Sequence, residues 1–220
     1  YTLVIGLYKI GLLQDSALPF IGELNHIDIG VSENQLSTFE RKVFKISYQD
    51  IKSIRLPRLQ KDLGKYKRGR TLLIAGSKKY PGAAYLALRG AISSGAGFIS
   101  AILPDLVAKS IWQIAPEVVV KGIMMSDQNG NSCLFDVLKN IDLTSYESVV
   151  IGPGIGIDND DWQNLNSHLL NYEGLLILDA DALNRISQSN LGPRFFLDRK
   201  YKTWITPHIY EFKRLFPMID

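Results

Sequence analysis

TLLIAGSKKYPGAAYLALRGAISSGAGFIS, residues 71–100, is the stretch that decides the fold of this chain. Leu72 to Ala75 form a short apolar run that stops at Gly76-Ser77, which is typical of a strand covered on both faces of a parallel sheet. A helix is expected from Pro81 onward, because the following apolar residues recur at helical spacing. A second apolar run extends from Phe98 to Leu103. The stretch therefore predicts one βαβ unit.

The turn inside this unit has the features of an anion site. It joins the end of a strand to the start of a helix, where free backbone N–H groups and the helix dipole favour negative charge. Gly76, Gly82 and Ala83 are small enough to let a phosphate, or a sugar that carries one, approach the backbone.

Composition limits what else the chain can be. It has 220 residues, of which 46% are hydrophobic and 21% charged, enough for one sizeable α/β domain and a small appendage. A net charge of +3 argues against nucleic-acid binding, and the basic run 61–70 is interpreted as a solvated lead-in. The single cysteine, Cys133, is expected to pack as a small apolar side chain in a reducing, cytoplasmic compartment. No apolar stretch approaches the ~20 residues that cross a bilayer, so no membrane partner is expected.

Strands and helices are expected to alternate through the rest of the chain. This pattern predicts a mostly parallel sheet with helices on both faces. The expected strands are 117–124, 146–151, 175–178 and 202–205. The expected helices are 104–113, 133–140, 158–172, one near Ala182 and one near Tyr210. The apolar side of the first is expected to hold Leu106, Val107, Ile111 and Trp112.

The first fifty residues are organised differently. Two strands are expected at 2–7 and 23–29, followed by a polar linker and a short helix at 50–56 that Pro57 closes. Two strands alone cannot bury a core, so they must pack on something else. Because the chain lacks an initiator Met and opens inside a strand, we expect it to be a fragment.

Small and polar residues gather directly after four of the predicted strands. They are Gly76-Ser77, Gly152 to Gly156, Asp179 with Asp181, and Thr206 with His208 and Glu211. Ligands of open α/β sheets bind outside the carboxyl ends of the strands. We therefore expect these clusters to converge on one crevice.

Each cluster has a functional and a structural interpretation. In Gly152-Pro153-Gly154-Ile155-Gly156, glycines could turn several N–H groups toward a phosphate, or could simply form a tight turn. Asp179 and Asp181 could carry Mg²⁺ through water or bind a sugar hydroxyl, or one of them could cap the helix near Ala182. His208 could contact a phosphate or an amide while Glu211 orients it, or Glu211 could be only a first-turn helix residue. His26 and His168 are interpreted as surface or packing residues.

Together these motifs resemble a known family. GSKKYPGAAYLALRGAISSGAG, VVIGPGIG, LILDADALN and WITPHIYEFKRL, in this order, resemble the ribokinase-like NAD(P)H-hydrate dehydratases over residues 48–220. TLVIGLYKIGLL and GELNHIDIG resemble the closing segment of the NAD(P)H-hydrate epimerase domain. The resemblance implies an epimerase remnant at 1–32, a linker at 33–47, and a dehydratase domain from 48 to 220 whose C-terminal part is missing.

The resemblance also implies a reaction. Such enzymes return the S-epimer of hydrated NAD(P)H to NAD(P)H by using ADP, or ATP, to convert the C6 hydroxyl into a phosphate, which the ring nitrogen then expels. Mg²⁺ is an expected cofactor, although no protein metal site is expected. The expected partners are the hydrated dinucleotide, an adenine nucleotide and further copies of the chain in a homo-oligomer.

The family's substrate contacts carry over to Ala83, Gly154 and His208, with Glu211 and Asp181 as supporting residues and Gly76, Gly82, Gly152 and Gly156 in the backbone loops. This chain has Lys67-Arg68-Gly69 where the family often has His-Lys-Gly, and TPHIYE in place of TPHPGE. The family's catalytic aspartate lies in a Gly-x-Gly-Asp segment, which does not occur before Asp220. Because losing a general base costs about 10²–10⁴-fold, we expect these residues alone to have little or no activity.

Two alternatives stay open at this point. One is a ribokinase-like kinase of a small alcohol, which would share the sheet and the nucleotide end. The other is a non-catalytic module that binds a nucleotide or a partner protein.

Overall fold

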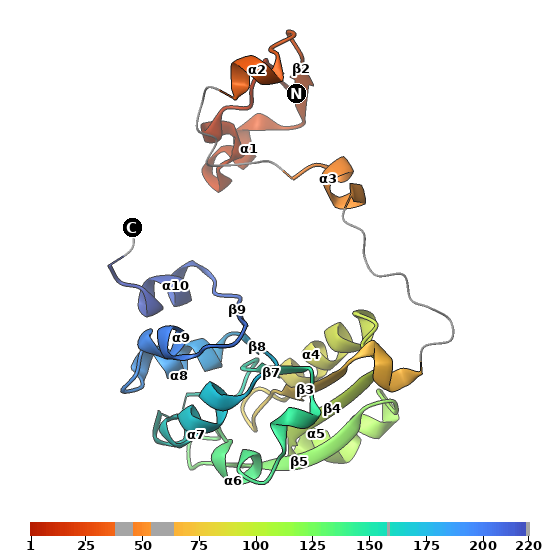
Figure 1. Cartoon of the computed structure of the whole chain (residues 1–220), viewed down its shortest axis with the longest axis vertical. Coiled ribbons are helices and arrows are strands. Elements are labelled where there is room, and N and C mark those ends of the chain that lie inside the picture. The colour runs from red at the N-terminus through yellow and green to blue at the C-terminus, as the bar shows by residue number, and fades with distance from the viewer. Residues whose placement is uncertain (38–45, 54–63, 158, 219–220) are drawn as a thin grey trace. The chain divides into compact units, whose positions relative to one another are not determined.

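The computed structural model describes residues 1–37, 46–53, 64–157 and 159–218. The chain divides into two compact units, Tyr1–Arg58 and Leu59–Asp220 (Figure 1). Residues 38–45 of the expected linker lie outside the described residues, and the division into 1–32, 33–47 and 48–220 stays a prediction.

The first unit is built on two short parallel strands, with Thr2 opposite Leu24 and Ile5 opposite Ile27. Val4 and Ile21 are buried, whereas Leu3 is 63% and Phe20 86% exposed. The unit thus encloses little apolar surface, as expected for two isolated strands. Its elements are β1 (Thr2–Ile5), η1 (Ile10–Leu13), η2 (Asp15–Ala17), α1 (Leu18–Ile21), β2 (Leu24–Ile27), α2 (Glu33–Leu36) and α3 (Tyr48–Ser53). α3 begins earlier than the helix expected at 50–56, whose last residues lie outside the described ranges.

The second unit is a sheet with helices on both faces (Figure 1). The strand order among the described residues is β6-β5-β4-β3-β7-β8-β9, and all neighbours are parallel except β5 and β6. The strands are β3 (Arg70–Ile74), β4 (Phe98–Pro104), β5 (Val119–Ser126), β6 (Ser132–Cys133), β7 (Ser148–Ile151), β8 (Leu175–Leu178) and β9 (Thr203–Ile205). The helices are η3 (Lys65–Arg68), α4 (Pro81–Ser93), α5 (Asp105–Ser110), η4 (Ile111–Gln113), α6 (Phe135–Leu138), η5 (Leu143–Ser145), α7 (Asn159–Asn171), α8 (Asp181–Gln188), α9 (Arg194–Asp198) and α10 (Ile209–Leu215).

β3 lies at the centre because its side chains are buried on both faces of the sheet. Leu72 and Ile74 pack in a core that α6 to α10 help to enclose. Leu73 and Ala75 pack in a second core under α4 and α5. The uninterrupted apolar run predicted a strand covered on both faces, which the structure confirms, and the mostly parallel fold is confirmed as well.

Two local predictions were wrong. Ser132–Cys133 forms β6, and the helix expected at 133–140 is confined to Phe135–Leu138. The chain reverses at Gly130, so Cys133 pairs with Met125 and is half-buried instead of fully packed. In the helix expected at 104–113, Pro104 ends β4 instead, and the chain tightens into η4.

The apolar face predicted for that helix was correct only in part. Val107 and Ile111 are buried, whereas Leu106 is 64% and Trp112 66% exposed. The tightening into η4 rotates Trp112 out of the helical register, and its indole donates to the Lys109 carbonyl at 3.1 Å.

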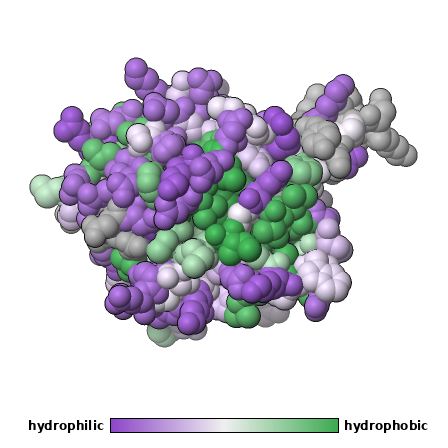
Figure 2. Space-filling view, turned by 90° about the horizontal axis from the view of Figure 1, so that it is seen from below, coloured by the Kyte–Doolittle hydropathy of each residue, from purple (hydrophilic) through white to green (hydrophobic). Residues whose placement is uncertain are grey.

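One edge of the sheet is partly open. β5 pairs with β6 only at Met125 and Ser126, so the rest of that edge has no strand beside it among the described residues. Figure 2 shows the molecule from below, and hydrophobic side chains gather near the middle of the surface seen from that side. On β5, Ile123 is 42% and Met125 71% exposed. Such an edge favours association, but the homo-oligomer stays a prediction.

Candidate functional site

The site is formed by the loops that follow β3, β7, β8 and β9, which are consecutive neighbours in the sheet. These strands are parallel, so their carboxyl ends lie along one edge. Direct contacts join the loops in turn. The Gly76 N–H donates to the Pro153 carbonyl at 2.7 Å, and the Thr206 hydroxyl donates to the Asp179 carboxylate at 2.8 Å.

Gly154 lies against the start of α4. Its φ is +67°, and a Cβ placed there would lie 2.5 Å from the Ala83 Cβ and 3.0 Å from the Tyr80 Cβ. Any larger residue would push the two loops apart, because real Cβ atoms do not approach so closely. The structure therefore brings Ala83 and Gly154, two residues expected to contact substrate, onto one small surface.

Gly152 lies against the loop that follows β8. A Cβ at Gly152 would lie 1.8 Å from the Asp179 carbonyl oxygen, which only glycine permits. Ala180, next in the chain, has a positive φ of 48°, an uncommon conformation for a residue with a side chain. Strain of this kind is found where a loop is held in one shape by its surroundings.

Asp181 is the first residue of α8 and supports the glycine loop. Its Oδ2 accepts from the Gly156 N–H at 2.8 Å, and its Oδ1 accepts from the Asn184 amide at 3.4 Å. The alternative that Asp179 or Asp181 caps α8 was wrong, because the N-cap is Ala180 and no side chain makes the capping bond. Asp181 acts instead on the loop that contains Gly154.

Asp179 and Asp181 could supply only a small part of the ligands of a Mg²⁺ ion. Both oxygens of Asp181 accept protein hydrogen bonds, and among the described residues there is no group of three His, Cys, Asp or Glu that could hold a metal ion. Mg²⁺ commonly binds through one or two carboxylates together with substrate phosphates and water. Half-buried Asp179 is the carboxylate that could contribute in this way.

His208 is the N-cap of α10, an unusual role for histidine. Its Nδ1 accepts from the N–H groups of Tyr210 and Glu211, so the ring proton is assigned to Nε2, which lies 3.3 Å from Glu211 Oε1. The other oxygen of Glu211 accepts from the His208 N–H at 3.0 Å, which completes a capping box. Glu211 is buried and orients the imidazole, whose side chain is 61% exposed.

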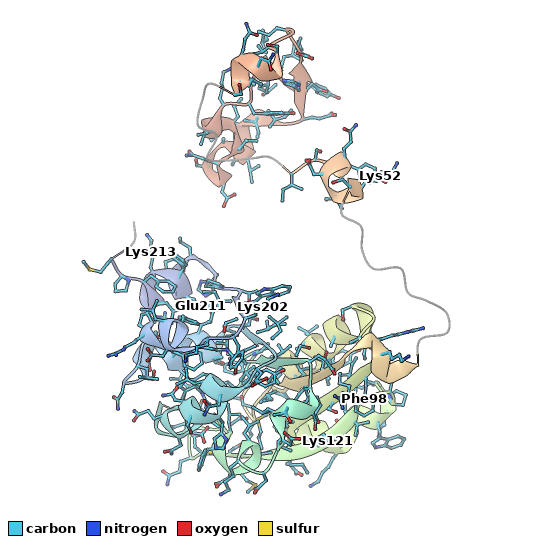
Figure 3. All side chains as sticks on the ribbon, viewed as in Figure 1. Lys52, Phe98, Lys121, Lys202, Glu211 and Lys213 are labelled. Carbon is cyan, nitrogen blue, oxygen red and sulfur yellow. The ribbon has the colours of Figure 1, made fainter. Side chains whose placement is uncertain are left out.

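Figure 3 shows Glu211 on α10, well separated from Phe98 and Lys121 on β4 and β5. The four strand-end loops therefore lie in the half of the sheet that runs from β3 to β9, and the turn between β5 and β6 reaches them from the other half through Ser132. Gly82 lies within α4, and a Cβ there would meet no atom within 4 Å. Gly82 is thus not required by the backbone, unlike Gly152 and Gly154.

A groove of about 570 Å³ extends from the site along the face of the sheet beside α4. Ala83, Pro153 and Asp179 line one end, and apolar residues such as Leu73, Val150 and Ile177 line the rest.

One wall of the site is a hairpin between β5 and β6 that was not predicted from the sequence. The Asp127 carboxylate accepts from the backbone and side chain of Asn131, and Ser132 donates to the carbonyls of Gly76 and Ile155 through its hydroxyl and N–H. Burial opposes ionisation of Asp127, but the hydrogen bonds from Asn131 outweigh it and hold the pKa of Asp127 below its ordinary value. The Asn129-Gly130 pair, a strong hairpin signal, could have revealed this turn.

Comparison with known proteins identifies the family of this chain. The NAD(P)H-hydrate dehydratase family profile matches residues 71–220. A bifunctional NAD(P)H-hydrate repair enzyme from Synechocystis sp. is 36% identical over 220 residues, covering 98% of this chain and 40% of the relative. The corresponding enzyme from Gloeobacter violaceus is 35% identical over 223 residues, covering 99% of this chain and 42% of the relative. The chain thus spans about two fifths of the length of these curated relatives.

Solved structures give the same fold. A ribokinase-like superfamily protein from Enterococcus faecalis is 28% identical with a TM-score of 0.57, covering 73% of this chain and 52% of that one. An ADP/ATP-dependent NAD(P)H-hydrate dehydratase from Bacillus subtilis, co-crystallized with ATP/Mg²⁺, is 26% identical with a TM-score of 0.53, covering 73% and 51%. Among the described residues, no helix has the length and apolar character needed to cross a membrane.

Proposed function

Because the chain belongs to the NAD(P)H-hydrate dehydratase family, we propose that it takes part in the ADP- or ATP-dependent return of the S-epimer of hydrated NAD(P)H to NAD(P)H. The observation that carries the proposal is the packing of Gly154 on Ala83. This contact brings two of the motifs that resemble the family, those containing Ala83 and Gly154, into one surface at the carboxyl ends of the strands.

The chemistry requires that a poor leaving group be made a good one. Hydroxide leaves the C6 position of the hydrated ring slowly, whereas phosphate leaves readily once the ring nitrogen supplies its electron pair. Loss of a proton from C5 then forms the C5–C6 double bond of NAD(P)H. Transfer of a nucleotide phosphate to the C6 hydroxyl achieves this, and Mg²⁺ would neutralise phosphate charge during the transfer.

The described residues would bind and orient the substrate. Ala83 and Gly154 offer a close-packed backbone surface for the dinucleotide, and half-buried Asp179 lies beside it. His208, held by Glu211, presents an exposed imidazole edge from the neighbouring strand end. The role of each residue in binding, and the catalytic aspartate, stay predictions from the resemblance.

We also propose that residues 1–32 are the end of an epimerase domain. The alignment with the bifunctional Synechocystis enzyme covers 98% of this chain, so it extends into the first unit, which contains the parallel strands β1 and β2. An epimerase fused ahead of the dehydratase would supply the S-epimer that the dehydratase consumes.

Thermal stabilisation tests the substrate class. We expect hydrated NADPH to raise the Tm of the chain, whereas a thiazole or pyrimidine alcohol leaves it unchanged. The complete product of the gene that encodes these residues should also regenerate the near-ultraviolet absorbance of NADPH from the hydrate when ADP or ATP and Mg²⁺ are present. If only the thiazole or pyrimidine alcohol raises the Tm, the result would favour a small-alcohol kinase and contradict the proposal.

A further inference from the structure

Arg185 is a fully buried arginine in the middle of α8, with 0% exposure. Its guanidinium donates to three backbone carbonyls: to Gly156 at 2.7 Å, to Ser132 at 2.8 Å and to Ile155 at 3.2 Å. Two of these carbonyls belong to the glycine loop and the third to the hairpin strand β6. One side chain therefore fastens two separate walls of the site to α8.

The same guanidinium pairs with Asp161 on α7 at 3.1 Å. The Asp161 carboxylate also accepts from the N–H groups of Leu134 and Phe135, at 2.6 and 2.8 Å. Burying a charged group is costly unless its hydrogen-bonding capacity is satisfied. The hydrogen-bonding capacity of the Arg185 guanidinium is satisfied by the loop carbonyls and by the Asp161 carboxylate, which the two backbone N–H groups hold in place.

Gly156 is held at both of its backbone polar groups by α8. Its N–H donates to Asp181 and its carbonyl accepts from Arg185. These two contacts lie only two residues from Gly154, which packs on Ala83. Rotation of the Gly156 peptide would therefore turn the loop that positions Gly154.

We infer that Arg185 is a positioning residue that holds the Gly152 to Gly156 loop in the arrangement that receives the hydrated dinucleotide. The inference rests on the proposed function, because the loop is taken to contact that substrate. The planar guanidinium suits this role, since it donates in several fixed directions at once, whereas the single ammonium of lysine does not.

The chain contains a matched control. Arg199 is also buried, with 5% exposure, and also donates to backbone carbonyls, those of Leu169 and Gly174, as well as to the Thr203 hydroxyl at 2.8 Å. Gly174 and Thr203 lie at the amino ends of β8 and β9, at the other end of the strands from the site, and Leu169 lies in the last turn of α7. Arg199→Lys thus removes similar bonds without touching the glycine loop.

The test compares Arg185→Lys with Arg199→Lys. We expect both to lower the Tm, but only Arg185→Lys to weaken the binding of hydrated NADPH, by roughly ten- to hundred-fold. In the complete gene product, Arg185→Lys should raise KM for hydrated NADPH with a much smaller change in kcat. Amide hydrogen exchange should become faster at residues 152–156 in Arg185→Lys and stay unchanged there in Arg199→Lys.

Several outcomes would overturn the inference. If both lysine variants weaken binding equally, or if neither does while the wild type binds, Arg185 has only a structural role. If the wild type itself does not bind hydrated NADPH, the proposed function fails instead. If Arg185→Lys does not fold, Asp161→Asn replaces it, because this variant keeps Arg185 but weakens its ion pair. The inference then requires that Asp161→Asn also lose affinity for hydrated NADPH, to a smaller degree.

Discussion

Gly154 and Ala83 come from the loops after β7 and β3, and they pack so closely that a Cβ on Gly154 would lie 2.5 Å from that of Ala83. Two motifs that are far apart in the sequence thus share one surface. Because Tyr80 also lies 3.0 Å from the same point, the contact leaves no room for a side chain.

Gly154→Ala should damage both folding and binding. The positive φ of Gly154 and the overlap with Ala83 are expected to lower the free energy of unfolding by about 1–3 kcal/mol. The loop must shift to relieve the overlap, so affinity for hydrated NADPH should fall by at least about ten-fold. Urea denaturation and calorimetric titration measure the two effects.

The control is Gly90→Ala in α4, where a Cβ meets no atom within 4 Å and φ is not positive. This change should increase the free energy of unfolding by about 0.5–1 kcal/mol, since alanine favours the helix. If Gly154→Ala is as well tolerated as Gly90→Ala, the close packing of the two loops is wrong.

His208 allows capping to be separated from ligand contact. His208→Ala removes the acceptor for the Tyr210 and Glu211 N–H groups and should cost about 1 kcal/mol of stability. His208→Asn retains a good N-cap acceptor and should keep most of that stability. Both variants should lose affinity for hydrated NADPH. Full affinity in His208→Asn would limit His208 to a capping role.

The central strands could be predicted from the sequence because they are buried on both faces. Leu72, Leu73 and Ile74 form a run that no surface element would contain, and the structure places them at the centre of the sheet. The strand-end loops follow from that order, since adjacent parallel strands bring their carboxyl ends together.

What was missed depends on contacts between distant residues. Arg185 looks like a solvated helix residue in the sequence, and only its carbonyl partners in two loops explain its burial. β6 was not predicted, and its second residue, Cys133, was assigned to a helix, because a strand of two residues carries almost no periodic signal. Trp112 was expected to be buried, but its register changes where the chain tightens into η4.

Alkaline pH should destabilise the second unit through Tyr172. Burial raises the pKa of the Tyr172 phenol from 10.0 to about 12, and its hydroxyl donates to the Tyr146 carbonyl at 2.9 Å. The unfolded phenol ionises first, so this contribution is fully present below pH 10 and is lost as the pH rises toward 12. Tyr172→Phe should show a smaller fall in Tm over that interval, and an identical fall in both proteins would contradict the assignment.

Acid pH should act through Glu147 at the amino ends of β3 and β7. Hydrogen bonds from Arg70, whose guanidinium lies 3.1 Å from Glu147 Oε1, lower the pKa of Glu147 below its ordinary value of 4.5. The stabilisation is present above that value and is lost as the pH falls through the lowered pKa. The pair is exposed, so Glu147→Gln should cost less than about 1 kcal/mol near neutral pH and remove this acid sensitivity. An unchanged acid profile in Glu147→Gln would exclude the pair as its source.

The central claim is that four separate strand-end loops form one site for the hydrated dinucleotide. Hydrogen exchange with and without hydrated NADPH tests it most directly, because the ligand should slow exchange in the loops that it covers. We expect protection at residues 76–83, 152–156, 179–183 and 206–211 together, and none at the Arg70 and Glu147 end of the strands. Protection confined to one of these loops, or found only at the opposite end of the sheet, would contradict the claim.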